Sequence, residues 1–202
     1  MSSSSKRNSM LPPIAKHGPK PPTKLSSTLT ISDSAILTGH HSIIIMSESV
    51  IHPRTRLEST SGSLLIGKRC IVHERSHVGA APEPSTPGAS PTRDGGIVIG
   101  DYVTVEAAAV VEAGGTEVGE GSVIGMGSRI GAGAKIGKNC TITPKSVIAP
   151  GEEIPDFTVV FSNGMRRTDR RDLGDMRLRA QVRQIGVLKA LIPTNLSKFQ
   201  ER

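Results

Sequence analysis

An aliphatic residue recurs at every sixth position between Val118 and Val160 of this chain. The series is Val118, Ile124, Ile130, Ile136, Ile142, Ile148, Ile154 and Val160. Neither the period of an α-helix nor that of a β-strand keeps such residues on one face. A chain that turns a corner every six residues does, because each coil then stacks its aliphatic side chains on those of the next coil. The spacing therefore predicts a parallel β-helix with about three hexads per coil.

The same spacing continues upstream in four shorter runs. They are Ile31, Leu37 and Ile43; Ile45, Ile51 and Leu57; Ile66, Val72 and Val78; and Ile99, Val105 and Val111. The seven-residue step from Val111 to Val118 predicts a bulged residue, and the short step from Ile43 to Ile45 predicts a break in register. The fold class is therefore an all-β solenoid, a left-handed parallel β-helix of about seven coils, whose end coils need covers.

Small residues occupy the fifth place of most hexads, and two of them are the only cysteines, Cys70 and Cys140. We expect both to be buried free thiols, because their spacing fits neither a zinc site nor a disulfide framework. Glycines at the corners (Gly67, Gly119, Gly125, Gly131 and Gly137), together with Asn139, are expected to adopt unusual backbone angles. The reduced cysteines, the lack of a signal peptide and the lack of a long apolar run predict a cytoplasmic protein.

The expected organisation has three parts. Only the middle part follows the hexad spacing, and a loop interrupts it. Residues 1–28 are rich in Ser, Pro and Lys and are expected to form a disordered tail. Residues 29–164 form the β-helix domain, which is interrupted by a Pro-rich loop at 80–96. Residues 165–202 form a basic linker and a C-terminal amphipathic helix, expected over 170–192.

The apolar residues of this helix recur three and four positions apart. One interpretation is that they fold back on the last coils as a cap. The other is that Leu188, Leu191 and Ile192 bind a partner by packing into its groove. The overall charge of +7 belongs to the two ends of the chain, but base-stacking aromatics are nearly absent, so we expect no nucleic-acid partner.

Proteins with this repeat include acyltransferases and zinc carbonic anhydrases, so the six histidines (His17, His40, His41, His52, His73 and His77) are the candidates for chemistry. A zinc site needs several imidazoles that converge on one ion. His73 and His77 are four residues apart and take different places in their hexads, which favours two partly exposed side chains. The last coil reads VVFSNGMRR, without the Gly-x-Pro-Ala of the transferases, and the Pro-rich loop holds no histidine. We therefore expect no catalytic, metal or cofactor-binding residues and no cofactor.

The order of the motifs resembles one family in particular. An IHP corner (Ile51 to Pro53) precedes IGKRC and VHERSHVGA, and the Pro-rich insertion and IVIGDYVTVE follow. The bulge, IAPGEEIPDFTVV, SNGMRR and a helix containing LIP (Leu191 to Pro193) complete the series. This arrangement is similar to the dynactin subunit 6 family, the hexapeptide-repeat subunits of the dynactin pointed-end complex, over about residues 29–199.

The resemblance implies a structural role without catalysis. The chain would pair with dynactin subunit 5, beside the pointed-end actin-related protein and dynactin subunit 4. It would support dynein-driven transport along microtubules and cargo selection in the cytoplasm and cytoskeleton, without inserting into a membrane. The alternative is a hexapeptide-repeat enzyme, an acyltransferase or a zinc carbonic-anhydrase-like homotrimer, with its sites between identical chains.

Overall fold

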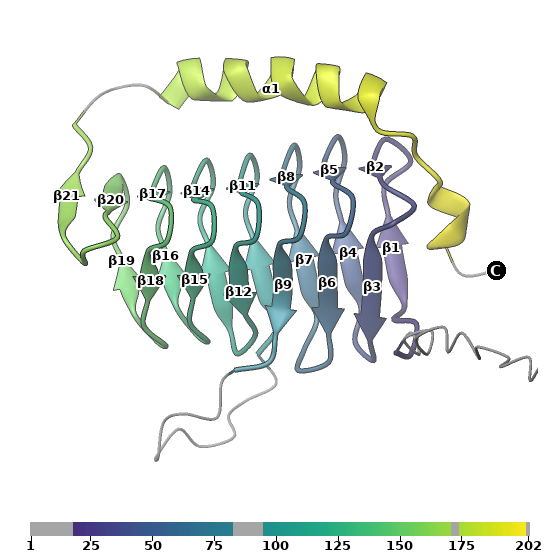
Figure 1. Cartoon of the computed structure of the whole chain (residues 1–202), viewed down its shortest axis with the longest axis horizontal. Coiled ribbons are helices and arrows are strands. Elements are labelled where there is room, and N and C mark those ends of the chain that lie inside the picture. The colour runs from purple at the N-terminus through teal and green to yellow at the C-terminus, as the bar shows by residue number, and fades with distance from the viewer. Residues whose placement is uncertain (1–17, 83–94, 171–173, 201–202) are drawn as a thin grey trace, which may run out of the picture.

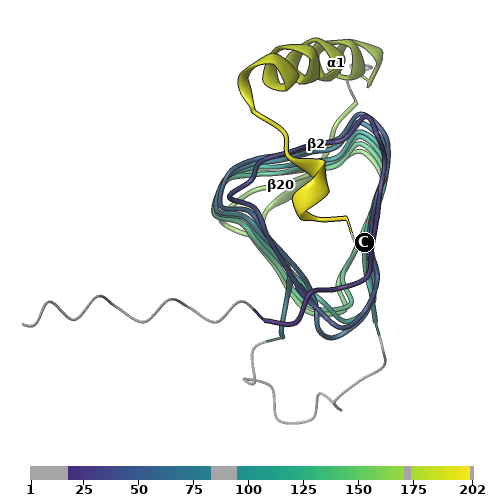
Figure 2. The same cartoon turned by 90° about the vertical axis from the view of Figure 1, so that its right-hand side faces the viewer.

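The computed structural model describes residues 18–82, 95–170 and 174–200, which form a straight rod of stacked coils with one long helix beside it (Figure 1). The coils have a triangular outline when viewed along the rod (Figure 2). Each complete coil adds one short strand to each of three parallel sheets, and six coils are complete while a seventh reaches two of the sheets. The predicted left-handed parallel β-helix with a C-terminal helix is confirmed.

The strands follow one another around the coil from the first sheet to the third. The first sheet holds β1 (Thr23–Leu25), β4 (Ile43–Ile45), β7 (Leu64–Ile66), β10 (Ile97–Ile99), β13 (Thr116–Val118), β16 (Lys135–Ile136) and β19 (Glu153–Ile154). The second sheet holds β2 (Thr30–Ile31), β5 (Val50–Ile51), β8 (Ile71–Val72), β11 (Thr104–Val105), β14 (Val123–Ile124), β17 (Thr141–Ile142), β20 (Thr158–Val160) and the antiparallel β21 (Arg166–Thr168). The third sheet holds β3 (Ile36–Gly39), β6 (Arg56–Ser59), β9 (His77–Ala80), β12 (Val110–Glu112), β15 (Arg129–Ile130) and β18 (Val147–Ile148).

The interior of the rod is built from the aliphatic residues that the six-residue spacing singles out. All of them are buried except Leu37, which is half-buried and packs against the core in the first coil. Cys70 and Cys140 are buried free thiols, as predicted. Burial raises the pKa of Cys70 to about 12, so this thiol stays protonated and unreactive at neutral pH.

The expected break in register between Ile43 and Ile45 is wrong. Both residues belong to β4 and point inward, on either side of the outward Ile44. A strand alternates its side chains between two faces, so two inward residues two positions apart fit one short strand. The extra residue predicted after Val111 is confirmed, because Val111 and Glu117 are six residues apart whereas their partners in the next coil, Ile130 and Lys135, are five apart.

The corner glycines serve a different purpose from the one expected. Gly119 and Gly137 have ordinary backbone angles, and the positive φ values fall two residues later, at Gly121 and Asn139. A Cβ atom on Gly119 would lie 2.5 Å from the carbonyl carbon of Gly137 in the next coil. Glycine is therefore required at this place because neighbouring coils approach closely there.

Two expected boundaries differ from the structure. Strand β1 lies within the expected tail of residues 1–28, because it pairs in parallel with β4 and Leu25 packs on the core. Residues 1–17 of that tail, and 83–94 of the Pro-rich loop, lie outside the described residues. Within the expected linker, β21 pairs with β20 and closes one edge of the second sheet.

The C-terminal helix α1 (Gly174–Leu191) runs along the outside of the second sheet, back toward the first coil (Figure 1). Its Ile185 packs with Val50 of β5 and Ile71 of β8, in the second and third coils. The short helix η1 (Leu196–Lys198) then lies across the open end of the first coil (Figure 2), where Leu196 contacts the core. The segment therefore covers early coils, and the expected cap on the last coils is wrong. Within the described residues, no helix is both long enough and apolar enough to cross a membrane.

Candidate functional site

Two histidines come together at the corner between the second and third sheets. His52 directly follows β5, and His73 directly follows β8 one coil later. The backbone N–H of His52 donates to the carbonyl of Val72 at 2.9 Å, which fixes the two coils in register. The imidazole rings consequently stack with their centroids 4.6 Å apart and their planes tilted by 34°. We call His52 and His73 the corner pair.

The backbone beneath the corner pair is held by hydroxyl groups. The Thr55 hydroxyl lies 2.9 Å from the carbonyl oxygen of His52 and 3.1 Å from that of His73, so it bridges the two coils. The Ser76 hydroxyl donates to the same His73 carbonyl at 2.6 Å. These contacts satisfy the carbonyl groups at a tight turn and keep the two imidazoles in place.

Burial sets the charge state of the corner pair. Both rings are partly buried, and the loss of water lowers the pKa of His52 and of His73 below the usual range for histidine. The neighbouring imidazole lowers the pKa of His52 further, whereas the carboxylates of Glu106 and Glu74 oppose the decrease at His73. At neutral pH both rings are therefore neutral, and a neutral imidazole is the form that accepts a proton.

One ring nitrogen of the pair has no hydrogen-bond partner in the described part of the chain. The Nε2 atom of His52 is buried and makes no hydrogen bond with any described residue. Leaving a buried polar atom unpaired costs about 1–3 kcal/mol, so such an atom in a well-packed fold requires an explanation.

The other described histidines do not join the corner pair. His77 lies at the start of β9, and its Nε2 is 3.0 Å from a carboxylate oxygen of Glu58 on β6. His40 and His41 are exposed, and His17 lies outside the described residues. The separation of His73 from His77 agrees with their different places in the hexad. The stacking of His73 on His52 was missed, although both directly follow an inward aliphatic residue (Ile51 and Val72).

A metal site has no support in the part of the chain that the structure describes. No group of three or more His, Cys, Asp or Glu side chains there converges as a metal would require. The corner pair supplies only two imidazoles, and zinc needs at least three protein ligands in its catalytic sites.

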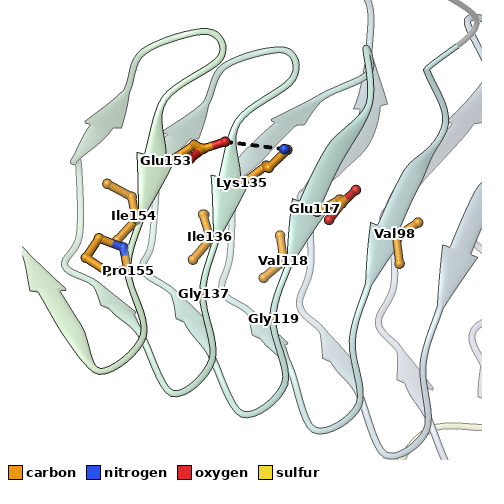
Figure 3. Close-up of a pocket in the computed structure, with 10 residues that line it drawn as sticks. All are labelled: Val98, Glu117, Val118, Gly119, Lys135, Ile136, Gly137, Glu153, Ile154 and Pro155. Carbon is orange, nitrogen blue, oxygen red and sulfur yellow. Dashed lines mark ion pairs between the residues drawn. The ribbon is translucent and has the colours of Figure 1, made fainter.

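A shallow groove lies on the outer face of the first sheet (Figure 3). Val98, Glu117, Lys135 and Glu153 follow one another along it, and Lys135 forms an ion pair with Glu153 at 3.3 Å. The groove contains no histidine, cysteine or serine. Its charged side chains, Glu117, Lys135 and Glu153, are exposed to solvent.

The three predicted partner-binding residues point to different sides of the C-terminal segment. Leu188 and Ile192 pack with Val50 and Ile71 on the second sheet. Leu191 faces away from the coil and is 70% exposed. Leu188 and Ile192 therefore contribute to the cover of the coil, and only Leu191 is free to contact a partner. Binding of a partner by these residues stays a prediction.

Comparisons of the sequence and the structure with known proteins show which proteins this chain resembles. The family described as bacterial transferase hexapeptide (six repeats) matches residues 115–150. A search of curated proteins gives no match. The structure is similar to that of a Bacillus cereus protein provisionally named as an acetyltransferase, with a TM-score of 0.68 and 22% identity over 84% of this chain and 91% of that chain. A hexapeptide transferase family protein from Anaplasma phagocytophilum has a TM-score of 0.66 and 16% identity, over 84% of this chain and 90% of that chain.

The chain has the fold of the hexapeptide-repeat transferases. At these identities the likeness establishes the fold alone, and nothing in it is specific to the dynactin subunits. It corrects one expectation: the chain was predicted not to be an enzyme, and this is contradicted by the transferase names of both the matching family and the similar structures. The enzyme alternative is therefore better supported than the structural role that the sequence favoured.

Proposed function

We propose that the chain is an acyltransferase in which the corner pair provides the general base. The observation that carries the proposal is the pair of stacked, neutral imidazoles at one corner of a fold shared with named transferases. In acyl transfer from a thioester, a base removes the proton of the attacking amine or hydroxyl, and the proton then passes to the leaving thiolate. A histidine that starts neutral can perform both steps, because it accepts the first proton and then donates it to the thiolate as imidazolium.

His73 is the better placed of the two to act as the base. The imidazolium that forms during the reaction would be stabilised by the carboxylates of Glu106 and Glu74, both of which favour the protonated form of His73. His52 stacks on this ring and limits its orientation. His73 is thus the proposed base and His52 the positioning residue.

The test is the release of thiol from acetyl coenzyme A by the full chain, with a panel of amine and hydroxyl acceptors. We expect an acceptor-dependent rate that falls at least about 100-fold in His73→Gln, the usual contribution of a general base. His52→Gln should lower the rate less. The matched control is His41→Gln, which removes an exposed imidazole and should leave the rate unchanged. No acceptor-dependent release, or equal rates for wild type and His73→Gln, would exclude this proposal.

A second candidate function is that of a dynactin pointed-end subunit, which the order of the sequence motifs favours. The structural observation in its support is the outward side of α1, where Leu191 is 70% and Val187 is 59% exposed. Apolar side chains on the free face of a surface helix are typical of helix-in-groove binding. The proposed partners are dynactin subunit 5, dynactin subunit 4 and the pointed-end actin-related protein, in the cytoplasm.

Affinity purification of the full chain from native cytosol, followed by mass spectrometry, tests this candidate. Recovery of those dynactin chains with wild type, and their loss with Leu191→Asp, is the expected result. Leu188→Asp is a poorer probe because Leu188 packs against the coil. Val147→Asp, an equally exposed apolar residue on the third sheet, serves as the control and should retain the partners. Purification without any dynactin chain would rule the candidate out.

A further inference from the structure

A cavity lies at the end of the rod where the C-terminal segment covers the first coil. The short helix η1 crosses this end (Figure 2), and the segment brings Leu196 and Phe199 against the core. A cavity of about 750 Å³ remains beside these two side chains. Sites for small ligands have volumes of about 300–1,000 Å³, so the cavity is large enough for a small molecule.

Three segments that are far apart in the sequence form the walls of this cavity. They are residues 18–23, 35–37 and 197–200. The Thr23 hydroxyl donates to the carbonyl oxygen of Phe199 at 2.5 Å, and Ser32 pairs with Thr194 in an antiparallel bridge. These contacts hold the C-terminal segment on the first coil, so the cavity is already formed in the folded chain. We call this cavity the first-coil pocket.

The inner part of the first-coil pocket is apolar. Pro21 and Ala35 are buried there, and Ile36, Leu37 and Phe199 are half-buried. Leu37 and Phe199 also pack against the core, so the apolar wall is continuous with the interior of the rod. A hydrocarbon chain that enters the pocket would therefore leave water and contact aliphatic and aromatic side chains, which is favourable.

The rim of the pocket is positively charged. Lys20 and Lys198 line it and are exposed, and none of the described residues that line it is acidic. The Nζ atom of Lys198 donates to the backbone carbonyl of Asp33 and lies 5.3 Å from the centre of the Phe199 ring. An ammonium group has three N–H donors, so Lys198 can still bind an anion. The pocket thus combines an apolar wall with a rim that attracts negative charge.

We propose that the first-coil pocket binds a fatty acid, with the hydrocarbon tail against Leu37 and Phe199 and the carboxylate at Lys20 and Lys198. One such molecule satisfies both the apolar wall and the charged rim. Residues 1–17, which precede the pocket in the chain, carry three basic and no acidic side chains, so they do not complement this rim in charge. Neither histidine of the corner pair lines the pocket, and the inference does not depend on the proposed acyl transfer.

The first test is calorimetric titration of the full chain with octanoate, decanoate and dodecanoate, each below the concentration at which it forms micelles. We expect one molecule per chain and a Kd that falls by about fourfold for each added methylene, the ratio expected when that group is buried. Dodecanol, which has a tail of the same length without the charge, should bind more weakly than dodecanoate. An affinity that does not depend on tail length would overturn the proposal.

Substitution of the rim lysines tests where the carboxylate binds. Lys20→Gln and Lys198→Gln should each raise the Kd of dodecanoate by about two- to fivefold, the usual range for an exposed ion pair. The matched control is Lys24→Gln, which removes an exposed lysine of β1 that does not line the pocket and should leave the Kd unchanged. Equal Kd values for wild type and both rim variants would show that the lysines do not hold the ligand.

The last measurement locates the bound tail by NMR. The chain has only three phenylalanines, so their ring signals are readily distinguished. Nuclear Overhauser contacts should connect the methylenes of dodecanoate with the ring of Phe199 and not with that of Phe157, which is 46% exposed. Contacts to Phe157 as strong as those to Phe199 would contradict the proposal. The absence of binding by all three acids would also contradict it, and would leave the pocket to a segment of this chain or to another protein.

Discussion

At the scale of single residues, the corner pair is the feature that departs most from a simple stacked coil. Most other inward and corner positions are filled by aliphatic, small or hydrogen-bonded groups. Moving such groups out of water costs little hydration free energy. Two imidazoles at successive corners lose hydration, and their pKa values fall as a result. The neutral ring that this produces is also the form needed for proton transfer.

The lowered pKa values predict how stability depends on pH. Above the ordinary histidine pKa of about 6.5, both the folded and the unfolded chain carry neutral rings. Below it the unfolded chain binds protons that the folded corner pair does not, so the free energy of unfolding falls until the pH passes the lowered folded pKa. We expect urea unfolding between pH 7 and pH 5 to show this loss, and the His52→Gln, His73→Gln double variant to show less of it. An equal pH dependence in both proteins would contradict burial of the pair.

The inward residues could be predicted from the sequence, and the corner pair could not. The six-residue spacing identifies Ile124 or Ile130 as interior because each coil there has three full hexads. Between Ile51 and Val72 the coil takes 21 residues, since extra residues are added at another corner. The spacing alone therefore does not place His52 beside His73. The two histidines come together because β5 pairs with β8, which sets Ile51 beside Val72 and the next residue of each strand at the same corner.

At the scale of secondary-structure elements, α1 is fastened by a small set of contacts. Ile185 is its one buried residue, packed against the outward faces of β5 and β8. The side chain of Gln181 adds a hydrogen bond of 2.9 Å to the carbonyl of Arg69. The segment after α1 continues over the first coil, where the Thr23 hydroxyl donates to the carbonyl of Phe199. The helix thus holds the cover of the first coil in position.

This arrangement predicts an unequal effect of truncating the helix. Ile185→Ala should lower the free energy of unfolding by about 2 kcal/mol, the lower part of the range for buried aliphatic residues, because the site is at the edge of the core. Val187→Ala, at a residue that is 59% exposed, should change it by less than about 0.5 kcal/mol. Urea denaturation of both variants checks this. Equal losses would mean that α1 does not pack as described.

The helix itself could be predicted, whereas its place on the rod could not. The three- and four-residue spacing gives a helix that agrees with α1 to within a few residues. The sheet residues it covers, Val50 and Ile71, are 114–135 residues away from Ile185 in the chain, and no local pattern links them. An expectation based on chain order therefore placed the cover on the last coils. Strand β21 was missed because its three residues, Arg-Arg-Thr, have no apolar alternation.

At the scale of the whole molecule, the rod separates three surfaces. The corner between the second and third sheets carries the imidazoles, the second sheet carries α1, and the outer face of the first sheet carries the shallow groove. Stability in such a repeat comes from contacts between neighbouring coils, so a change on one surface has little effect on the others. The proposed acyl transfer and partner binding can accordingly be tested with separate substitutions in the full chain.

The most direct test of the central claim, that the corner pair is the base of an acyltransferase, is the pH dependence of kcat/KM for acceptor-dependent thiol release. We expect kcat/KM to rise with pH through a midpoint below about 6.5, the ordinary histidine value, and to become constant near neutral pH. His73→Gln should abolish this rise, while His41→Gln should leave it in place. A midpoint at or above that ordinary value, a profile that His73→Gln leaves unchanged, or the absence of any transfer would show that His73 is not the base of an acyltransferase.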